Sequence, residues 1–205
     1  MKKQNNLLKL ISPLITLIVV AYIIFTCWSY LACWNSAAGL SQNIPQEFLR
    51  IKIYGSSSES EGNTVSGTIS IIDSNGNEIA AIERSWGGAY LAVEFARVTV
   101  NGKYFVFPSR IYGKNRITEE RHERFHGTLL EKYYDDYGQC MLLGYGSSLS
   151  ARKKLYNIAA FATGKYRVPS FGLVTRFSID LSGCRPDRYY SISFDENGQY
   201  IVEEL

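Results

Sequence analysis

The sequence predicts an α+β fold, in which an N-terminal transmembrane helix precedes a mainly antiparallel β-sheet domain with two inserted helices. Three observations lead to this prediction. One long N-terminal stretch lacks charge, most later segments alternate apolar and polar residues, and two segments carry apolar residues at helical spacing. A period of two indicates strands with one wet face, and a period of 3.6 indicates amphipathic helices.

The stretch from Leu10 to Trp34 contains no Asp, Glu, Lys or Arg. At about 1.5 Å per helical residue it reaches roughly 37 Å, which is enough to cross a hydrocarbon core of about 30 Å with some tilt. We therefore expect this stretch to be a transmembrane helix.

The charges that flank this stretch predict its orientation. Lys2, Lys3 and Lys9 precede it, whereas the next charged residues after it are Glu47 and Arg50. The positive-inside bias then places the N-terminus in the cytoplasm and the rest of the chain on the outer side. The predicted segments are a cytoplasmic N-terminus (1–9), a transmembrane signal anchor (10–34), a tether (35–46) and an extracytoplasmic α+β domain (47–205).

Two processing alternatives compete with a retained anchor. Small residues at positions 36–38 would suit a signal peptidase, although the apolar run is longer than the usual core of roughly 7 to 15 residues. Residues 30–33 (Tyr-Leu-Ala-Cys) resemble the lipobox of bacterial lipoproteins, with Leu31 one position closer to Cys33 than in that motif. Cleavage and lipidation therefore remain alternatives to the anchor.

The outer domain is predicted to be electrically neutral. The chain has 22 basic and 19 acidic residues, and three of the basic ones precede the apolar stretch, so 19 of each sign follow it. Nucleic-acid binding depends on a concentrated positive field, and we exclude it as a function. The chain also has 15 Tyr and 10 Phe, and such rings could contact a protein or carbohydrate ligand, although strands favour aromatic residues in any case.

Asn-Gly pairs punctuate the alternating segments at Asn75, Asn101 and Asn197. Asn-Gly is favoured in tight hairpins because type I′ turns need positive φ at both central residues. The sequence thus predicts hairpins over about 66–84, 89–107 and 189–204. In the second hairpin the apolar residues move from odd-numbered to even-numbered positions after Phe95, which indicates a bulge or a switch of face near Arg97.

Two helices are expected between these hairpins. Thr128 and Glu131 have capping-box spacing and precede an apolar face that ends at Gly138, and a second helix is expected from Ser148 to Thr163. A small β-sandwich with helices in one connection is the alternative architecture.

Cys140 and Cys184 both fall in the outer domain. An oxidising compartment would allow them to form a disulfide, which the chain-entropy model values at roughly 4 kcal/mol. The alternative is two buried free thiols.

His122, Glu123 and His126 form an H-E-x-x-H motif, which resembles the zincin signature. The resemblance implies a zinc hydrolase in which His122 and His126 bind the metal and Glu123 acts as the catalytic general base. However, charged residues surround the motif, and no third ligand has a recognisable position.

We therefore interpret the motif as a solvated turn and expect no cofactor. The preferred hypothesis is a non-enzymatic, single-pass envelope protein with an outward binding or structural domain. A membrane-tethered zinc hydrolase is the alternative.

Overall fold

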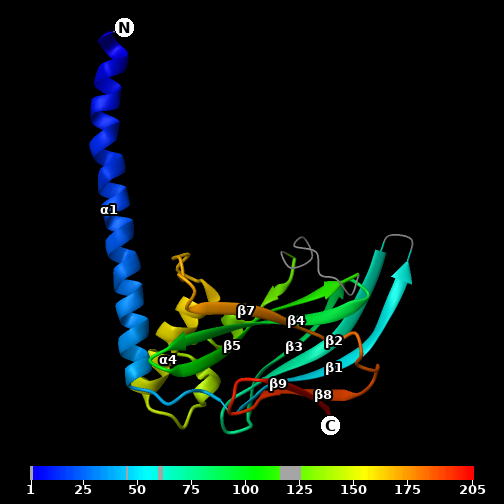
Figure 1. Cartoon of the computed structure of the whole chain (residues 1–205). Coiled ribbons are helices and arrows are strands. Elements are labelled where there is room, and N and C mark those ends of the chain that lie inside the picture. The colour runs from blue at the N-terminus through cyan, green and yellow to red at the C-terminus, as the bar shows by residue number, and fades with distance from the viewer. Residues whose placement is uncertain (1, 45, 60–61, 116–125) are drawn as a thin grey trace.

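The computed structural model describes residues 2–44, 46–59, 62–115 and 126–205. A long helix, α1 (Lys2–Ala38), projects from a domain built of two antiparallel sheets (Figure 1). Within it, Pro13–Ala38 is long and apolar enough to cross a membrane. The predicted α+β class with an N-terminal candidate membrane helix is confirmed.

The two sheets contain all the strands of the described chain. The first has the order β3-β2-β1-β8-β9 and the second the order β6-β5-β4-β7, and all neighbouring strands are antiparallel. We call them the five-stranded and the four-stranded sheet. The strands are β1 (Gln46–Glu59), β2 (Gly62–Ile72), β3 (Glu78–Gly87), β4 (Tyr90–Val100), β5 (Lys103–Lys114), β6 (Thr128–Leu129), β7 (Val174–Asp180), β8 (Tyr189–Phe194) and β9 (Tyr200–Glu204).

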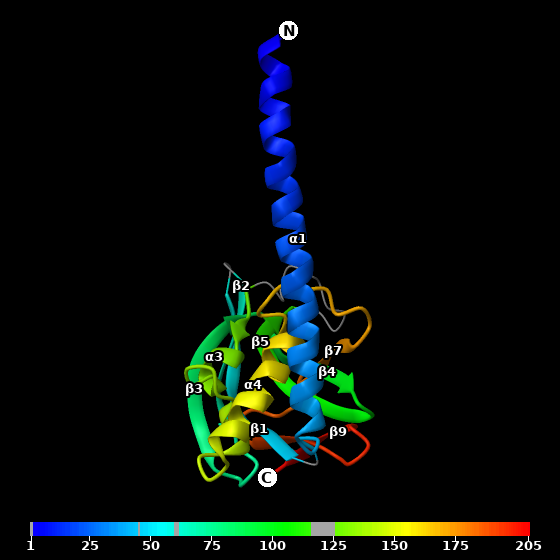
Figure 2. The ribbon, with the colours of Figure 1, turned by 90° about the vertical axis from the view of Figure 1, so that its left-hand side faces the viewer.

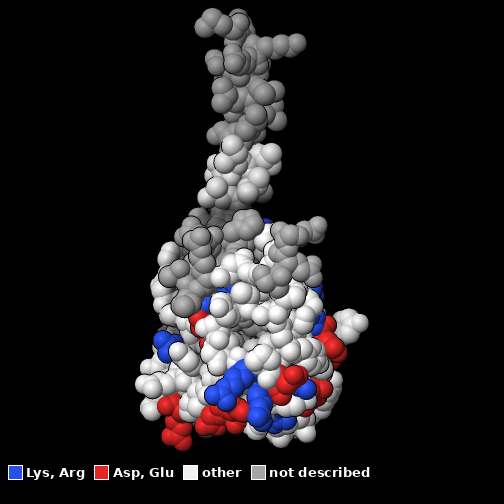
Figure 3. Space-filling model, turned by 90° about the vertical axis from the view of Figure 1, so that its right-hand side faces the viewer, with Lys and Arg blue, Asp and Glu red and all other residues white. Residues whose placement is uncertain are grey.

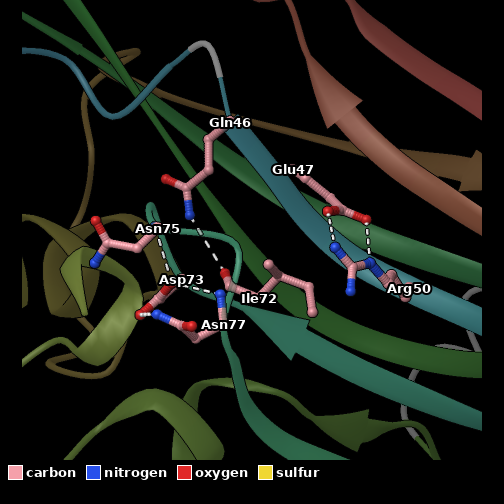
Figure 4. A network of polar contacts seen from close by, with 7 residues as sticks. All are labelled: Gln46, Glu47, Arg50, Ile72, Asp73, Asn75 and Asn77. Carbon is pink, nitrogen blue, oxygen red and sulfur yellow. Dashed lines mark hydrogen bonds and ion pairs between the residues drawn. The ribbon is translucent and has the colours of Figure 1, made fainter. Parts of the chain in front are cut away.

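The three predicted hairpins are present as β2–β3, β4–β5 and β8–β9. Figure 4 shows how the first turn is held: a carboxylate oxygen of Asp73 accepts hydrogen bonds from the backbone N–H groups of Asn75 and Asn77, each at 2.8 Å. Nearby, the side-chain amide of Gln46 donates to the Ile72 carbonyl at 3.3 Å, so β1 is joined to the end of β2. The turn is thus fastened by side chains as well as by its Asn-Gly sequence.

An aromatic cluster joins the two sheets. Phe48 and Phe194 come from the five-stranded sheet and Phe95 and Phe177 from the four-stranded sheet. Their ring centroids lie 5.0 to 6.2 Å apart, mostly edge to face, which is the favoured geometry for packed rings. The faces of the two sheets therefore share one core.

Strand β4 is buried on both faces, since Leu91–Ala96 are all buried and successive side chains point to opposite sides. One side meets the five-stranded sheet through Phe95, and helix α4 (Leu149–Thr163) packs on β4 and β5. A register irregularity occurs as predicted, but at Glu94/Phe95, where Ser109 of β5 is the extra residue beside Pro108. Proline suits such a position because it has no N–H to donate to the ladder.

The second predicted helix is confirmed as α4. The Ser148 hydroxyl accepts a hydrogen bond from the Ala151 N–H at 3.2 Å, and Gly164 ends the helix with φ +78°. These are the usual N-cap and C-cap devices.

The first predicted helix is wrong in its start and length. Thr128 lies in β6, and its hydroxyl accepts a hydrogen bond from the Trp86 indole at 3.0 Å instead of capping a helix. Pairing with β5 keeps this segment extended. Only the short helix α3 (Glu131–Tyr134) follows, with a 3₁₀ turn η1 at Met141–Leu143.

The C-terminal half of α1 packs on α4 (Figure 2). Ser29, Cys33, Ser36 and Ala37 are buried, and their spacing places them on one helical face. The Asn157 amide of α4 donates to the Ser36 hydroxyl at 3.2 Å. Helix α1 is thus part of the domain's packing as well as an extension beyond it.

The segment expected to be a tether, 35–46, also packs on the domain. Ile44 is buried, and the buried Asn43 side chain bonds to both backbone groups of Val106, donating to its carbonyl at 2.7 Å and accepting from its N–H at 2.9 Å. The chain that leaves α1 is therefore fastened to β5 within a few residues.

Candidate functional site

The structure describes only the last residue of the H-E-x-x-H motif. His126 is exposed and precedes β6 by two positions, whereas His122 and Glu123 lie outside the described residues. Among the residues that are described, no group of three or more His, Cys, Asp or Glu side chains is placed to hold a metal ion. The zinc site therefore stays a prediction.

The predicted disulfide between Cys140 and Cys184 is not formed, and both are free thiols. Cys140 is buried beside α4, where its N–H donates to the Arg152 carbonyl, whereas Cys184 is half-buried in the loop before β8. Burial raises the pKa of the Cys140 thiol to about 12 and that of Cys184 to about 11. Both thiols stay protonated at neutral pH, which suits packing and not nucleophilic chemistry.

An open groove lies where β7 and β9, the edge strands of the two sheets, come together. Its volume is about 580 Å³. The Phe177 and Tyr200 rings both line it and stack on one another, with centroids 6.5 Å apart and planes 20° apart. We call this the edge groove; it is lined by Arg97, Thr175, Phe177, Gly198, Gln199 and Tyr200.

The groove combines ring surface with hydrogen-bonding side chains. The Arg97 guanidinium lies 5.9 Å from the centroid of the Tyr104 ring, so that ring holds the cation at the groove wall. Gln199 and Thr175 add an amide and a hydroxyl, and the Tyr200 side chain is 53% exposed. Apolar surface with a few placed polar groups is the usual composition of a small-ligand site.

A second cavity, of about 430 Å³, lies between α3, β6 and the end of α4 and has charged walls. The Lys165 ammonium binds Asp135 at 2.6 Å and approaches Glu131 at 3.6 Å. Burial, the largest single influence, lowers the pKa of Lys165, but the hydrogen bonds and charges of Asp135 and Tyr156 together outweigh burial and raise the pKa above the usual range. Lys165 is therefore a permanently charged structural group and not an amine nucleophile.

Charges of both signs share the surface at the end of the domain far from the α1 N-terminus (Figure 3). On this face the basic and acidic side chains lie beside one another, and no single sign dominates. This mixture agrees with the balanced composition of the domain.

Sequence reasoning missed the edge groove. Gln199 and Tyr200 directly follow the predicted Asn197-Gly198 turn, but nothing in the sequence pairs that turn with β7. The high aromatic content was the only signal, and it applies equally to core rings such as Tyr134, whose hydroxyl donates to the Pro108 carbonyl at 3.0 Å.

We compared the chain with protein-family models, with curated proteins and with solved structures, and none of the three comparisons found a match.

Proposed function

We propose that this protein is a single-pass membrane protein of the cell envelope whose outward domain binds a carbohydrate in the edge groove. The observation that carries the proposal is the groove itself, in which the Tyr200 ring lies beside the side chains of Arg97 and Gln199. The domain then acts as a binding module held at the membrane surface by α1.

The membrane assignment rests on α1. Pro13–Ala38 qualifies as a spanning helix, and large apolar side chains such as Leu17, Ile18 and Ile24 are 58 to 67% exposed along it. A soluble protein rarely exposes so large a continuous apolar surface. Three lysines before the span and none directly after it favour a cytoplasmic N-terminus and an outward domain.

The size and chemistry of the groove favour a carbohydrate over a protein partner. Its volume of about 580 Å³ falls in the range of small-ligand sites. A stable protein interface would need about 800 Å² of matched surface on each partner. The Arg97 side chain can donate to sugar hydroxyls and those of Gln199 and Thr175 can both donate and accept, while the exposed Tyr200 ring offers a flat apolar face.

Two tyrosines with equal exposure provide the test. Tyr189 and Tyr200 are each 53% exposed and lie on neighbouring strands of the five-stranded sheet, but only Tyr200 lines the groove. Full-length protein in nanodiscs would be screened against defined oligosaccharides, including fragments of envelope polysaccharides. Tyr200→Ala should abolish binding and Tyr189→Ala should preserve it.

Equal binding by the two variants would contradict the groove as the site. Absence of binding to every oligosaccharide, together with binding of an extended peptide that Tyr200→Ala abolishes, would instead identify a protein ligand.

The zinc-hydrolase hypothesis is tested separately. Zinc would be measured in the purified full-length protein and in His126→Ala. If the wild-type protein contains stoichiometric zinc and His126→Ala does not, His126 is a metal ligand. The zinc-hydrolase hypothesis would then replace the binding proposal.

A further inference from the structure

Residues 164–173, which we call the docking loop, run along the side of α1. The Tyr22 hydroxyl donates to the Arg167 carbonyl at 3.4 Å, and the Tyr30 hydroxyl donates to the Pro169 carbonyl at 3.0 Å. Tyr22 and Tyr30 are about 12 Å apart along the helix axis. Their hydroxyls meet carbonyls only two residues apart in the loop, so the loop lies against α1 between these two tyrosines.

Ring contacts fasten the docking loop to the same stretch of helix. Phe25 meets Tyr166 edge to face at 5.9 Å, and Tyr30 lies 5.9 Å from Phe171. Tyr30 also packs on Phe161 in the last turn of α4, at 5.0 Å between centroids. The loop and the end of α4 thus occupy the level of α1 between Tyr22 and Tyr30.

The part of α1 that precedes the docking loop is too short to cross a bilayer by itself. From Leu10 to Ala21 the helix is only about 18 Å long, whereas a hydrocarbon core is about 30 Å thick. Starting the span closer to the N-terminus would place Lys9, and then Lys3 and Lys2, in hydrocarbon, which is costly. The span must therefore continue past Tyr22, up to the level at which the docking loop contacts α1.

We propose that the docking loop inserts into the outer interface of the same membrane that α1 crosses, so that the domain sits partly embedded and in a fixed orientation. This inference rests on the membrane anchoring proposed above and adds a second contact with the lipid. The partner is the lipid surface itself.

The side chains of the docking loop fit this position. Phe171 is 77% exposed, which is unusual for a large ring in water but suits the boundary between headgroups and acyl chains. On α1, the exposed Trp28 and Trp34 lie at and beyond the same level, and tryptophan is enriched at membrane interfaces. Exposed Arg167 can extend its charged end toward lipid phosphates.

The opposite end of α4 provides a matched control. Asn157 meets Ser36 and Phe161 meets Tyr30, so α4 runs antiparallel to α1 and its start points away from the membrane. Tyr145, just before that start, is 76% exposed, nearly the same as Phe171. The two positions thus differ in predicted depth and not in exposure within the protein.

The experiment measures depth by spin labelling of the full-length chain in vesicles of phosphatidylcholine and phosphatidylglycerol. Cys27 and Cys184, which are not fully buried, are replaced by Ser, and single labels are placed by Phe171→Cys, Tyr145→Cys and Ile18→Cys. Accessibility to oxygen, which partitions into lipid, is compared with accessibility to a water-soluble nickel complex. Circular dichroism and thermal unfolding confirm that each labelled chain folds as the parent does.

We expect the Phe171 and Ile18 labels to favour oxygen over nickel and the Tyr145 label to favour nickel. If the Ile18 label lies in lipid but the Phe171 label is as accessible to nickel as Tyr145, the docking loop does not insert and this inference is wrong. If the Ile18 label itself is accessible to nickel, the membrane anchoring fails first.

Discussion

Strands β4 and β9 both pair antiparallel with the strands beside them, yet they lie in opposite environments. In β4 the residues from Leu91 to Ala96 are buried without interruption, whereas in β9 only Val202 is partly covered. β4 lies between the five-stranded sheet and α4, and β9 is an edge strand beside the groove. The domain thus contains one strand buried in its core and one that borders an open groove.

Helix α1 repeats this contrast within one element. From Pro13 to Phe25 every side chain is exposed, whereas from Thr26 to Ala38 one face is covered by the domain. The exposed half is apolar all round, as lipid contact requires, and the covered face is built from small residues that allow α4 to approach.

The largest expected effect comes from the centre of β4. Phe95→Ala removes a ring with no exposed surface that contacts Phe48, Phe177 and Phe194, and should reduce the free energy of unfolding by about 3–5 kcal/mol. Tyr200→Ala in β9, whose ring stacks only on Phe177 among the described rings, should cost about 0.5–1.5 kcal/mol. Denaturant unfolding followed by circular dichroism compares them, and equal losses would erase the contrast between the strands.

Adjacent alanines test the two sides of α1. Ala37 has no exposed surface and Ala38 is exposed. Ala37→Phe overpacks the contact with the domain and should destabilise it by about 1–3 kcal/mol. Ala38→Phe should change stability by less than about 0.5 kcal/mol. The measurement is thermal unfolding of the full-length protein in detergent, and identical curves for the two variants would show that α1 does not pack on the domain.

The start of α4 tests whether the helix that covers β4 depends on its local cap. Ser148→Ala removes the acceptor for the Ala151 N–H and should cost about 1 kcal/mol. Ser150→Ala, two positions later and exposed, should be neutral or slightly stabilising because alanine favours helix interiors. The measurement is the free energy of unfolding of the two variants. If Ser148→Ala leaves this free energy unchanged, packing alone holds the helix start.

The smallest expected effect is electrostatic and lies where β7 and β5 end beside β4. Burial of Asp180, the largest single influence, raises its pKa, but the hydrogen bonds from the Lys114 ammonium and from Ser182 together outweigh burial, so the net pKa is lowered. A carboxyl whose pKa is lower in the folded than in the unfolded protein stabilises the fold at pH values above its unfolded pKa of about 3.9. This stabilisation is lost as the pH falls through the folded pKa.

The stability difference between wild type and Asp180→Asn should therefore be largest near neutral pH and shrink below about pH 4. Unfolding midpoints across this range provide the measurement. A difference that grows on acidification would assign the pH dependence to another group.

Local patterns predicted several elements correctly. The Asn-Gly turns identified three hairpins, and the helix expected from Ser148 to Thr163 is present as α4. Such signals work because the relevant hydrogen bonds and φ values involve only a few neighbouring residues. The capping-box pattern at Thr128 failed, because a partner far along the chain, Trp86, takes its hydroxyl hydrogen bond.

The phase change in β4 shows why alternation alone was ambiguous. The change suggested an irregularity on that strand, but the extra residue is Ser109 of β5. Residues that point to either side of β4 are buried because both of its faces are covered. A strand covered on one face needs apolar residues only at every second position, whereas a strand between two layers needs them on both of its faces. Only the partner layers distinguish these cases.

By itself the sequence determined the candidate membrane helix, the antiparallel hairpins, the helix α4 and the charge balance of the domain, because each depends on residues close together in the chain. The tertiary structure decided the rest: that Cys140 and Cys184 stay apart, that β7 and β9 form a groove, and that α1 docks on α4 and the docking loop. These features join segments far apart in sequence, and their geometry follows from the packing of whole sheets and helices.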